Sequence, residues 1–247
     1  MSRELAVIPA RYASSRYPGK PLVPILGVPM VVRVARIAAE ALGATNVVVA
    51  TEDSRIARVV EAAGFRAVMT SDRCLTGTDR LAEVAELIEA DVYVNVQGDE
   101  PMLKPETICQ VVTTASATPG VIHNGMCRLG PEEDPANVNI PKVVATESGR
   151  LLYMSRAALP ASKDARQRPI VYWKQVCIYT FSGEQLRAFA AFGRKAVIES
   201  HEDIEILRFL ELGYPVQMVA VDGGSLAVDV PQDVLLVEEA MRTRGVT

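Results

Sequence analysis

The first 120 residues of this 247-residue chain alternate short apolar segments with amphipathic ones, and this rhythm restricts the fold more than any other feature. Asn46–Thr51 is apolar without polar alternation, as in a parallel strand buried on both faces. Pro29–Leu42 carries apolar residues at helical spacing between an initial proline and a following glycine. Repetition of this pair predicts an α/β fold with a doubly wound, mostly parallel, Rossmann-like sheet. Strands are expected at 4–9, 46–51, 65–69 and 91–96, and helices at 29–42, 53–63, 78–89 and from about 105.

Beyond residue 120 the pattern changes to short β-like segments separated by turns rich in Pro, Asp and Asn. We interpret residues 121–195 as a smaller β-rich region that serves acceptor binding, dimerisation or as a lid. Residues 1–120 and 196–247 then form a nucleotide-binding α/β domain. Strands are expected in this half at 121–128, 141–147, 151–154, 171–181 and 216–221, and helices at 183–192, 201–212 and from 231.

The loop after the first strand is the strongest chemical signal. It sets three cations, Arg11, Arg16 and Lys20, in a segment rich in Gly, Pro and Ser. Loops at the carboxyl edge of a parallel sheet are where nucleotides bind, and arginine and lysine side chains bind phosphate oxygens there. The segment therefore predicts a triphosphate site, although it matches neither Walker A nor GxGxxG. A solvated surface loop with incidental charge is the alternative.

Two aspartates, one after an expected strand and one before an expected helix, predict a magnesium site. Asp99 follows the apolar strand 91–96, and Asp229 precedes the helix that begins at Pro231. Mg²⁺ takes one or two protein carboxylates and completes its coordination with phosphate oxygens and water. Each aspartate alone is also typical of a turn or a helix cap, so the prediction depends on the pair.

The turn Thr76–Arg80 joins an expected strand to an expected helix and offers hydroxyl groups and another cation. It is suited to line a base or ribose pocket. The alternative is a plain helix cap made by Thr78 or Asp79.

Composition excludes several functions. A net charge of −4 without a basic run argues against nucleic acid as a partner. No apolar run approaches the length of a membrane span and no signal peptide is visible, so we expect a cytoplasmic protein that does not bind membranes. The four cysteines form no CxxC pair and the two histidines lie in no metal or nucleophile motif, which disfavours zinc sites, disulfides and Ser-His-Asp chemistry.

Taken together, the motifs resemble those of a known family. They are IPARYASSRYPGKPL, VATEDSRI, VMTSD, TGTDRLAEV, VNVQGDEPML, KVV with GRLLYMSRAALP, IYTF and VDVPQDV. In this order and spacing they look like the CMP-Kdo synthetases, the cytidylyltransferases that activate 3-deoxy-manno-octulosonate (Kdo). The resemblance covers essentially the whole chain. It implies an α/β nucleotide domain with a smaller region used in dimerisation, CTP as nucleotide, and a homodimer.

The resemblance also implies roles for individual positions. Nucleotide-binding residues would be Ala10, Arg11, Ser14, Arg16, Lys20, Thr76, Gly77, Arg80 and Gln97. Residues that bind Mg²⁺ would be Asp99 and Asp229, which with Arg11 and Lys20 form the catalytic set. Acceptor-binding residues would be Gln97, Arg156, Lys174, Gln175, Tyr179, Glu205 and Ile206. In this scheme an acceptor oxygen attacks the α-phosphorus of CTP and pyrophosphate leaves.

Two departures from the family pattern concern the acceptor. Gln175 stands where the family carries the His that contacts the sugar acid, and Ile206 replaces an acceptor-binding Gln. Loss of polar contacts weakens binding of a polyhydroxylated acceptor, and a phosphonate oxygen, already ionised near neutral pH, needs no general base. We therefore expect a phosphonate such as phosphonoformate as the small anionic acceptor. Cations of the acceptor segment that could neutralise it, or form a solvated face, are Arg156, Lys163, Arg166, Arg168 and Lys174.

Two alternatives stay open. One is a CMP-Kdo synthetase that acts on Kdo or a related 2-keto sugar acid through altered contacts. The other is a regulatory module that binds a nucleotide without chemistry. Both aspartates and the three loop cations argue against the second, because a binding module has no need of a metal at the α-phosphate.

Overall fold

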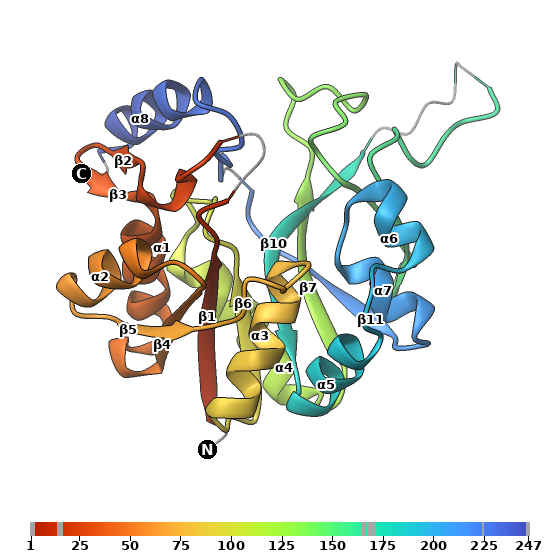
Figure 1. The fold of residues 1–247 in the computed structure, drawn as a ribbon. Coiled ribbons are helices and arrows are strands. Elements are labelled where there is room, and N and C mark those ends of the chain that lie inside the picture. Colours follow the sequence, from red (N-terminus) through yellow and green to blue (C-terminus); the bar gives the residue numbers. More distant parts are fainter. Residues whose placement is uncertain (1–2, 14–16, 165, 167–170, 224, 246–247) are drawn as a thin grey trace.

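The computed structural model describes residues 3–13, 17–164, 166, 171–223 and 225–245. One central sheet with helices on both faces organises them, which confirms the predicted doubly wound α/β fold (Figure 1). The strands are β1 (Glu4–Ala10), β2 (Pro24–Ile25), β3 (Val28–Pro29), β4 (Val47–Thr51), β5 (Arg66–Met69), β6 (Val92–Val96), β7 (Ile122–Arg128), β8 (Lys142–Ala145), β9 (Leu151–Ser155), β10 (Trp173–Phe181) and β11 (Val216–Ala220). The helices are α1 (Met30–Leu42), α2 (Ser54–Ala62), α3 (Gly77–Leu87), α4 (Pro105–Ala117), α5 (Gly183–Ala191), α6 (Val197–Glu202), α7 (Ile206–Glu211) and α8 (Asp233–Thr243), with 3₁₀ turns at Lys20–Leu22 and Ala44–Asn46.

The sheet has the strand order β11-β7-β10-β6-β1-β4-β5 within the described residues. β1 pairs in parallel with β4 and β6, β4 with β5, and β7 with β11. β10 runs antiparallel to both β6 and β7. Its first residues therefore lie at the edge where the parallel strands end. That edge is where ligands bind in open α/β sheets.

Two apolar layers hold the helices to the sheet. On one face, Leu81 of α3, Phe189 of α5 and Phe209 of α7 belong to one buried cluster. On the other, Val34 of α1 and Ile108 of α4 belong to a second cluster. β4 is buried at all five positions, as its unbroken apolar sequence predicts for a strand covered on both sides.

A third cluster connects the carboxyl-terminal helix to the loop after β1. Ile25 of β2 and Met30 of α1 pack against Val237 and Met241 of α8. Val228 belongs to the same buried cluster. This packing fixes the segment before α8 at the carboxyl edge of the sheet.

The prediction of one helix at 201–212 is wrong, because this part of the chain forms two short helices, α6 and α7. Between them Asp203 adopts a left-handed conformation with φ of 51°, which breaks the helical path. Arg156 Nη2 donates to the Asp203 carbonyl at 3.0 Å, and Lys195 Nζ contacts Asp203 Oδ1 at 2.7 Å. These contacts support a turn that the sequence pattern alone did not show.

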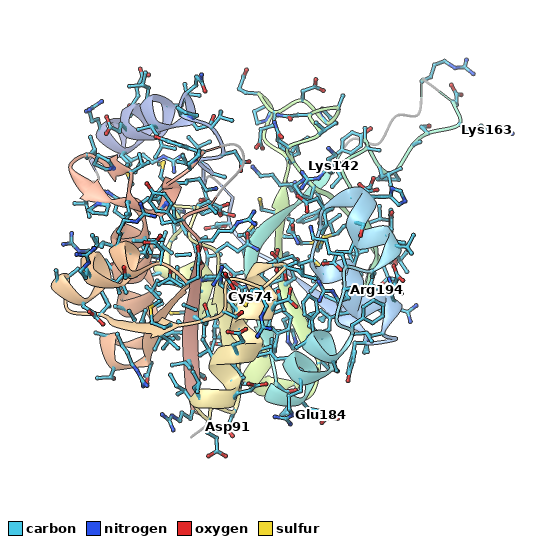
Figure 2. The ribbon with its side chains drawn as sticks, in the orientation of Figure 1. Cys74, Asp91, Lys142, Lys163, Glu184 and Arg194 are labelled. Carbon is cyan, nitrogen blue, oxygen red and sulfur yellow. The ribbon has the colours of Figure 1, made fainter. Side chains whose placement is uncertain are left out.

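Residues 121–195, set apart by the sequence pattern, are not a separate layer. β7 and β10 lie in the central sheet, and β8 pairs with the start of β10. β8 and β9 form an antiparallel pair, and the chain after β9 extends to a tip at Lys163 that stands away from the body (Figure 2). Use of this region for dimerisation stays a prediction.

Candidate active site

A cavity of about 340 Å³ opens at the carboxyl edge of the sheet. Segments from the whole length of the chain line it: the end of β1, the 3₁₀ turn at Lys20, the start of α3, the loop after β6, the start of β10 and the α6–α7 turn. The predicted site residues that line it are Ala10, Arg11, Lys20, Thr76, Gly77, Arg80, Gln97, Asp99, Arg156, Gln175, Tyr179, Glu205 and Asp229. The fold thus brings the phosphate, nucleotide and acceptor groups of the prediction to one cavity.

Four predicted residues are not part of this lining. Ser14 and Arg16 lie outside the described residues. Lys174 Nζ forms an ion pair with Glu133 beside a separate cavity of about 60 Å³. Ile206 is 1% exposed and packs in the core beneath α7, so it cannot contact an acceptor in this conformation.

The other expected acceptor cations are dispersed. Arg166 pairs with Asp164 at 3.1 Å on the exposed segment near Lys163, and Arg168 lies outside the described residues. Of the described ones, Arg156 alone lines the cavity. The solvated-face interpretation therefore fits Lys163 and Arg166 better.

Tyr12 anchors the cationic loop. Its backbone N–H donates to Glu52 Oε1 at 2.8 Å, and its carbonyl accepts from Gly19 N at 2.9 Å. The Arg55 guanidinium lies 3.4 Å from the centre of the Tyr12 ring. Gly19 has φ of 73°, and a Cβ there would meet the Tyr12 ring at 3.2 Å, so glycine is required by both conformation and space. These contacts fix the backbone from which Lys20 projects.

Lys20 lies between the two predicted metal ligands. Its Nζ is 3.2 Å from Asp99 Oδ2 and 3.8 Å from Asp229 Oδ1, and it donates to the Val228 carbonyl at 2.9 Å. Val228 N in turn donates to the Asp99 carbonyl at 2.9 Å, which fixes the two loops to each other. Asp99 and Asp229, far apart in sequence, are therefore neighbours.

The donor set fits a magnesium ion. Asp99 Oδ1 is buried and has no hydrogen-bond partner among the described residues, an unusual state for a carboxylate oxygen. With Asp99 Oδ2, Asp229 Oδ1 and the Val228 carbonyl, the cluster offers only oxygen atoms, the ligands that Mg²⁺ prefers. No group of three or more His, Cys, Asp or Glu side chains that could hold a metal ion occurs in the described part of the chain.

The turn at the start of α3 is fixed by a capping box and by a carboxylate from α7. Thr76 Oγ1 accepts from Asp79 N at 3.2 Å, and Asp79 Oδ2 accepts from Thr76 N at 2.8 Å. Glu205 accepts from Gly77 N at 3.1 Å and from both the N–H and the hydroxyl of Thr78. A helix cap is therefore present, but the N-cap is Thr76 and not Thr78 or Asp79, and Asp79 completes the capping box from the third helical position. Thr76 and Gly77 also line the cavity.

Arg80 is buried, and its contacts position the same turn. Its Nη2 pairs with Glu52 Oε2 at 2.6 Å, and its Nη1 donates to Thr70 Oγ1 at 2.6 Å. Since Glu52 also accepts from Tyr12 N, one carboxylate joins the cationic loop to the α3 turn.

A β-bulge in β10 shapes the acceptor side. The register with β7 shifts between Val176 and Tyr179. Asn124 of β7 compensates by donating from Nδ2 to the carbonyls of Val176 and Ile178, at 2.9 and 2.8 Å. Its Oδ1 accepts from Gln175 Nε2 at 3.0 Å, which orients Gln175 at the cavity wall.

Burial determines the protonation of two cavity residues on β10. Desolvation, followed by the charge of Glu100, raises the pKa of the Cys177 thiol well above its usual range. Desolvation likewise raises the pKa of the Tyr179 phenol well above its usual range. Both groups are therefore neutral near pH 7, and Cys177 is not a thiolate nucleophile.

The sequence reasoning missed three polar residues of the lining: Asn139, Lys195 and Asp203. Asn139 lies in a Pro- and Asn-rich segment that was interpreted only as turns, and Lys195 lies between two expected helices. Polar residues in such segments are common on any surface, so the only available signal was their position near strand ends.

Cations and a carboxylate pair at the carboxyl edge of a mixed α/β sheet define a nucleotidyltransferase site, and the comparisons with known proteins agree. Residues 5–217 match the family described as "Cytidylyltransferase". The chain belongs to the cytidylyltransferase family and is of the CMP-Kdo synthetase type. It is therefore a CTP-dependent nucleotidyltransferase.

Individual relatives cover nearly the whole chain. A mitochondrial 3-deoxy-manno-octulosonate cytidylyltransferase of Arabidopsis thaliana is 37% identical over 100% of this chain and 86% of its own. The 3-deoxy-manno-octulosonate cytidylyltransferase of Myxococcus xanthus is 39% identical over 98% of both chains. A solved CMP:2-keto-3-deoxy-manno-octonic acid synthetase complexed with CTP superposes with a TM-score of 0.90 at 34% identity, covering 98% of this chain and 100% of that one. Among the described residues, no helix has the length and apolar character of a membrane span.

Proposed function

We propose that this enzyme transfers CMP from CTP to Kdo and releases pyrophosphate. The observation that carries the proposal is the single cavity in which Lys20, Asp99 and Asp229 at one end share a continuous lining with Arg156 and Gln175 at the other. The relatives named as 3-deoxy-manno-octulosonate cytidylyltransferases support Kdo as acceptor, because they match over nearly their full length.

In the proposed reaction both partners are anions, so positioning and charge neutralisation supply most of the catalysis. Arg11 and Lys20 would bind the β- and γ-phosphates and stabilise the leaving pyrophosphate. Thr76 and Gly77 would contact the nucleoside, and Gln97 would lie where nucleotide and acceptor meet. The Arg80 guanidinium already binds Glu52 and Thr70, so its proposed role is to hold the turn at the start of α3.

Asp99 and Asp229 would hold Mg²⁺. When bound, the ion would polarise the α-phosphate and offset the charge of the two anions. The residues themselves fix the oxygen donors in place, since both loops are joined through Val228.

On the acceptor side, Arg156 would add positive charge beside the Kdo carboxylate. Its backbone N–H donates to Glu202, and its guanidinium donates to the carbonyls of Val138, Glu202 and Asp203, which holds the side chain at the cavity wall. Gln175 and the neutral Tyr179 phenol would serve the acceptor hydroxyl groups. Glu205 is committed to the cap of α3, so its proposed role is indirect.

The phosphonate expectation has lost part of its basis. It depended on two altered acceptor contacts, and Ile206 lies in the core, so its apolar character does not describe the acceptor pocket. The comparisons support Kdo and none of them names a phosphonate. Gln175 remains as the single altered contact at the cavity wall.

The decisive experiment measures pyrophosphate release with CTP and Mg²⁺ against Kdo, a nonulosonic acid and phosphonoformate. Turnover with Kdo and none with phosphonoformate is expected. Turnover with phosphonoformate alone would replace the proposed acceptor and show that Gln175 suffices to change it. If CTP binds but none of the acceptors in the panel gives pyrophosphate release, a regulatory module is favoured. UTP and ATP in place of CTP test the nucleotide preference.

We also propose a homodimer that uses the β8–β9 region, where Leu152 is 52% exposed. Sedimentation of the wild type and of Leu152→Glu tests this. A monomeric wild type would contradict it.

A further inference from the structure

We infer that Lys20 guards the metal site: its ammonium group competes with a divalent cation for Asp99 and Asp229 until the triphosphate of CTP draws it away. The inference rests on the proposed metal site. It adds an order of events, in which the metal enters together with the nucleotide rather than before it.

The first support is the number and kind of acceptors around Lys20. An ammonium group has three N–H donors. Lys20 Nζ has three oxygen neighbours, Asp99 Oδ2 at 3.2 Å, the Val228 carbonyl at 2.9 Å and Asp229 Oδ1 at 3.8 Å. The side chain is only 16% exposed, so the charge is held by protein groups more than by water. In this conformation the ammonium group occupies the space that a shared metal ion would need.

The second support is charge. The Lys20 ammonium offsets part of the negative charge of the two carboxylates, which weakens their attraction for a free dication. A dication between the same oxygens would lie within a few ångström of the Lys20 ammonium and be repelled by it. Lys20 must therefore leave before the metal is bound tightly.

The third support is that Lys20 can leave without disturbing the loop. Its backbone is fixed by the bond from Lys20 N to the Tyr17 carbonyl, and by the Tyr12–Gly19 contacts next to it. The side chain itself is a flexible four-carbon stem that lines the cavity. A triphosphate entering the cavity offers it new anionic partners. Its departure then removes the Lys20 contact from Asp99 Oδ2, Asp229 Oδ1 and the Val228 carbonyl, next to Asp99 Oδ1, which has no hydrogen-bond partner among the described residues.

The test measures Mn²⁺ binding without acceptor, by the electron paramagnetic resonance signal of the free ion. Lys20→Met removes the charge and keeps the length of the side chain. Lys20→Gln is a second neutral variant in case the first does not fold. Lys195→Met is the matched control, because it removes the same charge from the lining of the same cavity, where the lysine pairs with Asp203 instead.

Without CTP, we expect Lys20→Met to bind Mn²⁺ about ten-fold or more tightly than the wild type, and Lys195→Met to change affinity by no more than about two-fold. With CTP, the advantage of Lys20→Met should disappear, because Lys20 is then on the phosphates. Equal or weaker Mn²⁺ binding by both Lys20 variants in the absence of CTP would overturn the guard role and show instead that Lys20 organises the aspartates.

The same experiment separates this inference from the proposed function. If the wild type binds Mn²⁺ only with CTP and the Lys20 variants behave identically, the guard role fails while the metal site stands. If no variant binds Mn²⁺ even with CTP, the metal assignment itself fails. Neither result depends on which acceptor the enzyme uses.

Discussion

Glu205, the residue before α7, caps the start of α3 at Thr78: its Oε2 accepts from Thr78 N at 2.9 Å and from Thr78 Oγ1 at 2.6 Å. Desolvation raises the pKa of this carboxyl above its usual range, and it outweighs the hydrogen bonds from Thr78 and Gly77, which lower the pKa. A residue assigned to the acceptor by resemblance thus holds the turn that lines the nucleotide end of the cavity. The acceptor and nucleotide sides of the site share one structural support.

Glu205→Gln should weaken that support. An amide that replaces the carboxylate loses the charge at the helix start and can turn an N–H group toward the N–H groups of the turn. We expect a loss of about 1–3 kcal/mol in the free energy of unfolding and a higher KM for CTP. Glu211→Gln is the control, because Glu211 also accepts from a helix N–H, that of Ile198, but at an exposed position far from the cavity. A KM unchanged from wild type would show that Glu205 does not position the turn.

Arg208 should be among the least replaceable residues of the fold. Its guanidinium is fully buried between Glu199, at 2.7 Å, and Asp79, at 3.0 Å. Arg208→Met leaves Glu199 buried without its partner, which costs about 3–5 kcal/mol of unfolding free energy. The double variant Arg208→Met/Glu199→Gln should recover part of the loss in guanidinium denaturation. Simple additivity of the two single changes would argue against a coupled pair.

Replacing either of two fully buried asparagines by leucine should change the free energy of unfolding, but in opposite directions. Neither amide atom of Asn95 has a hydrogen-bond partner among the described residues. Asn95→Leu should therefore raise the free energy of unfolding by about 1–2 kcal/mol, since an unpaired buried amide is costly.

Asn124→Leu is the matched comparison. Asn124 supports the bulge of β10 through two carbonyls and orients Gln175, so its loss should destabilise by about 2–4 kcal/mol and impair acceptor binding. Urea denaturation of both variants checks the pair. Destabilisation by Asn95→Leu, with lowered activity, would mean that the Asn95 amide serves a bound group.

His123 should make stability fall in weak acid. Desolvation lowers its pKa from the ordinary value of 6.5. As the pH falls below about 6.5, His123 takes up a proton in the unfolded chain before it does so in the folded one. The free energy of unfolding therefore decreases with falling pH until the lower folded-state pKa is reached. As the pH is lowered from about 7.5 to 5.5, the wild type should therefore lose more unfolding free energy than His123→Gln, which keeps a polar group near Thr118. Parallel pH profiles of the two proteins would assign the acid sensitivity to other groups.

Asp99→Asn and Asp229→Asn should abolish turnover while leaving the fold intact. Each change removes one oxygen charge from the proposed metal site, and metal-assisted transfer depends on that charge. The expected loss in kcat is about 100-fold or more with little change in melting temperature. Asp233→Asn is the control, because it changes a carboxylate that accepts from the backbone N–H groups of Asp229 and Val230 and is not part of the cavity lining among the described residues. Rates near wild type in either variant would remove the metal assignment.

The sequence predicted what depends on local pattern. Apolar runs such as 46–51 and the Pro29–Leu42 repeat predicted the longer strands and the helices of the first half to within one or two residues, but not the two-residue strands β2 and β3. The motifs also predicted that Asp99 and Asp229 share one metal site, and the structure places both beside Lys20. The direction of a side chain is harder: Ile206 occupies an expected acceptor position along the chain, but the break at Asp203 turns it into the core. Asp203 itself gave no warning, because neither Gly nor Pro marks the break.

The reversed direction of β10 has a consequence for how such enzymes diversify. The proposed nucleotide contacts follow the ends of β1 and β6, whereas proposed acceptor contacts such as Gln175 lie at the beginning of β10. The chain that precedes β10 can therefore be lengthened, shortened or exchanged without altering the route by which the phosphate-binding loop leaves its strand. Evolution can therefore change the acceptor side of the cavity while the phosphate-binding loop stays the same.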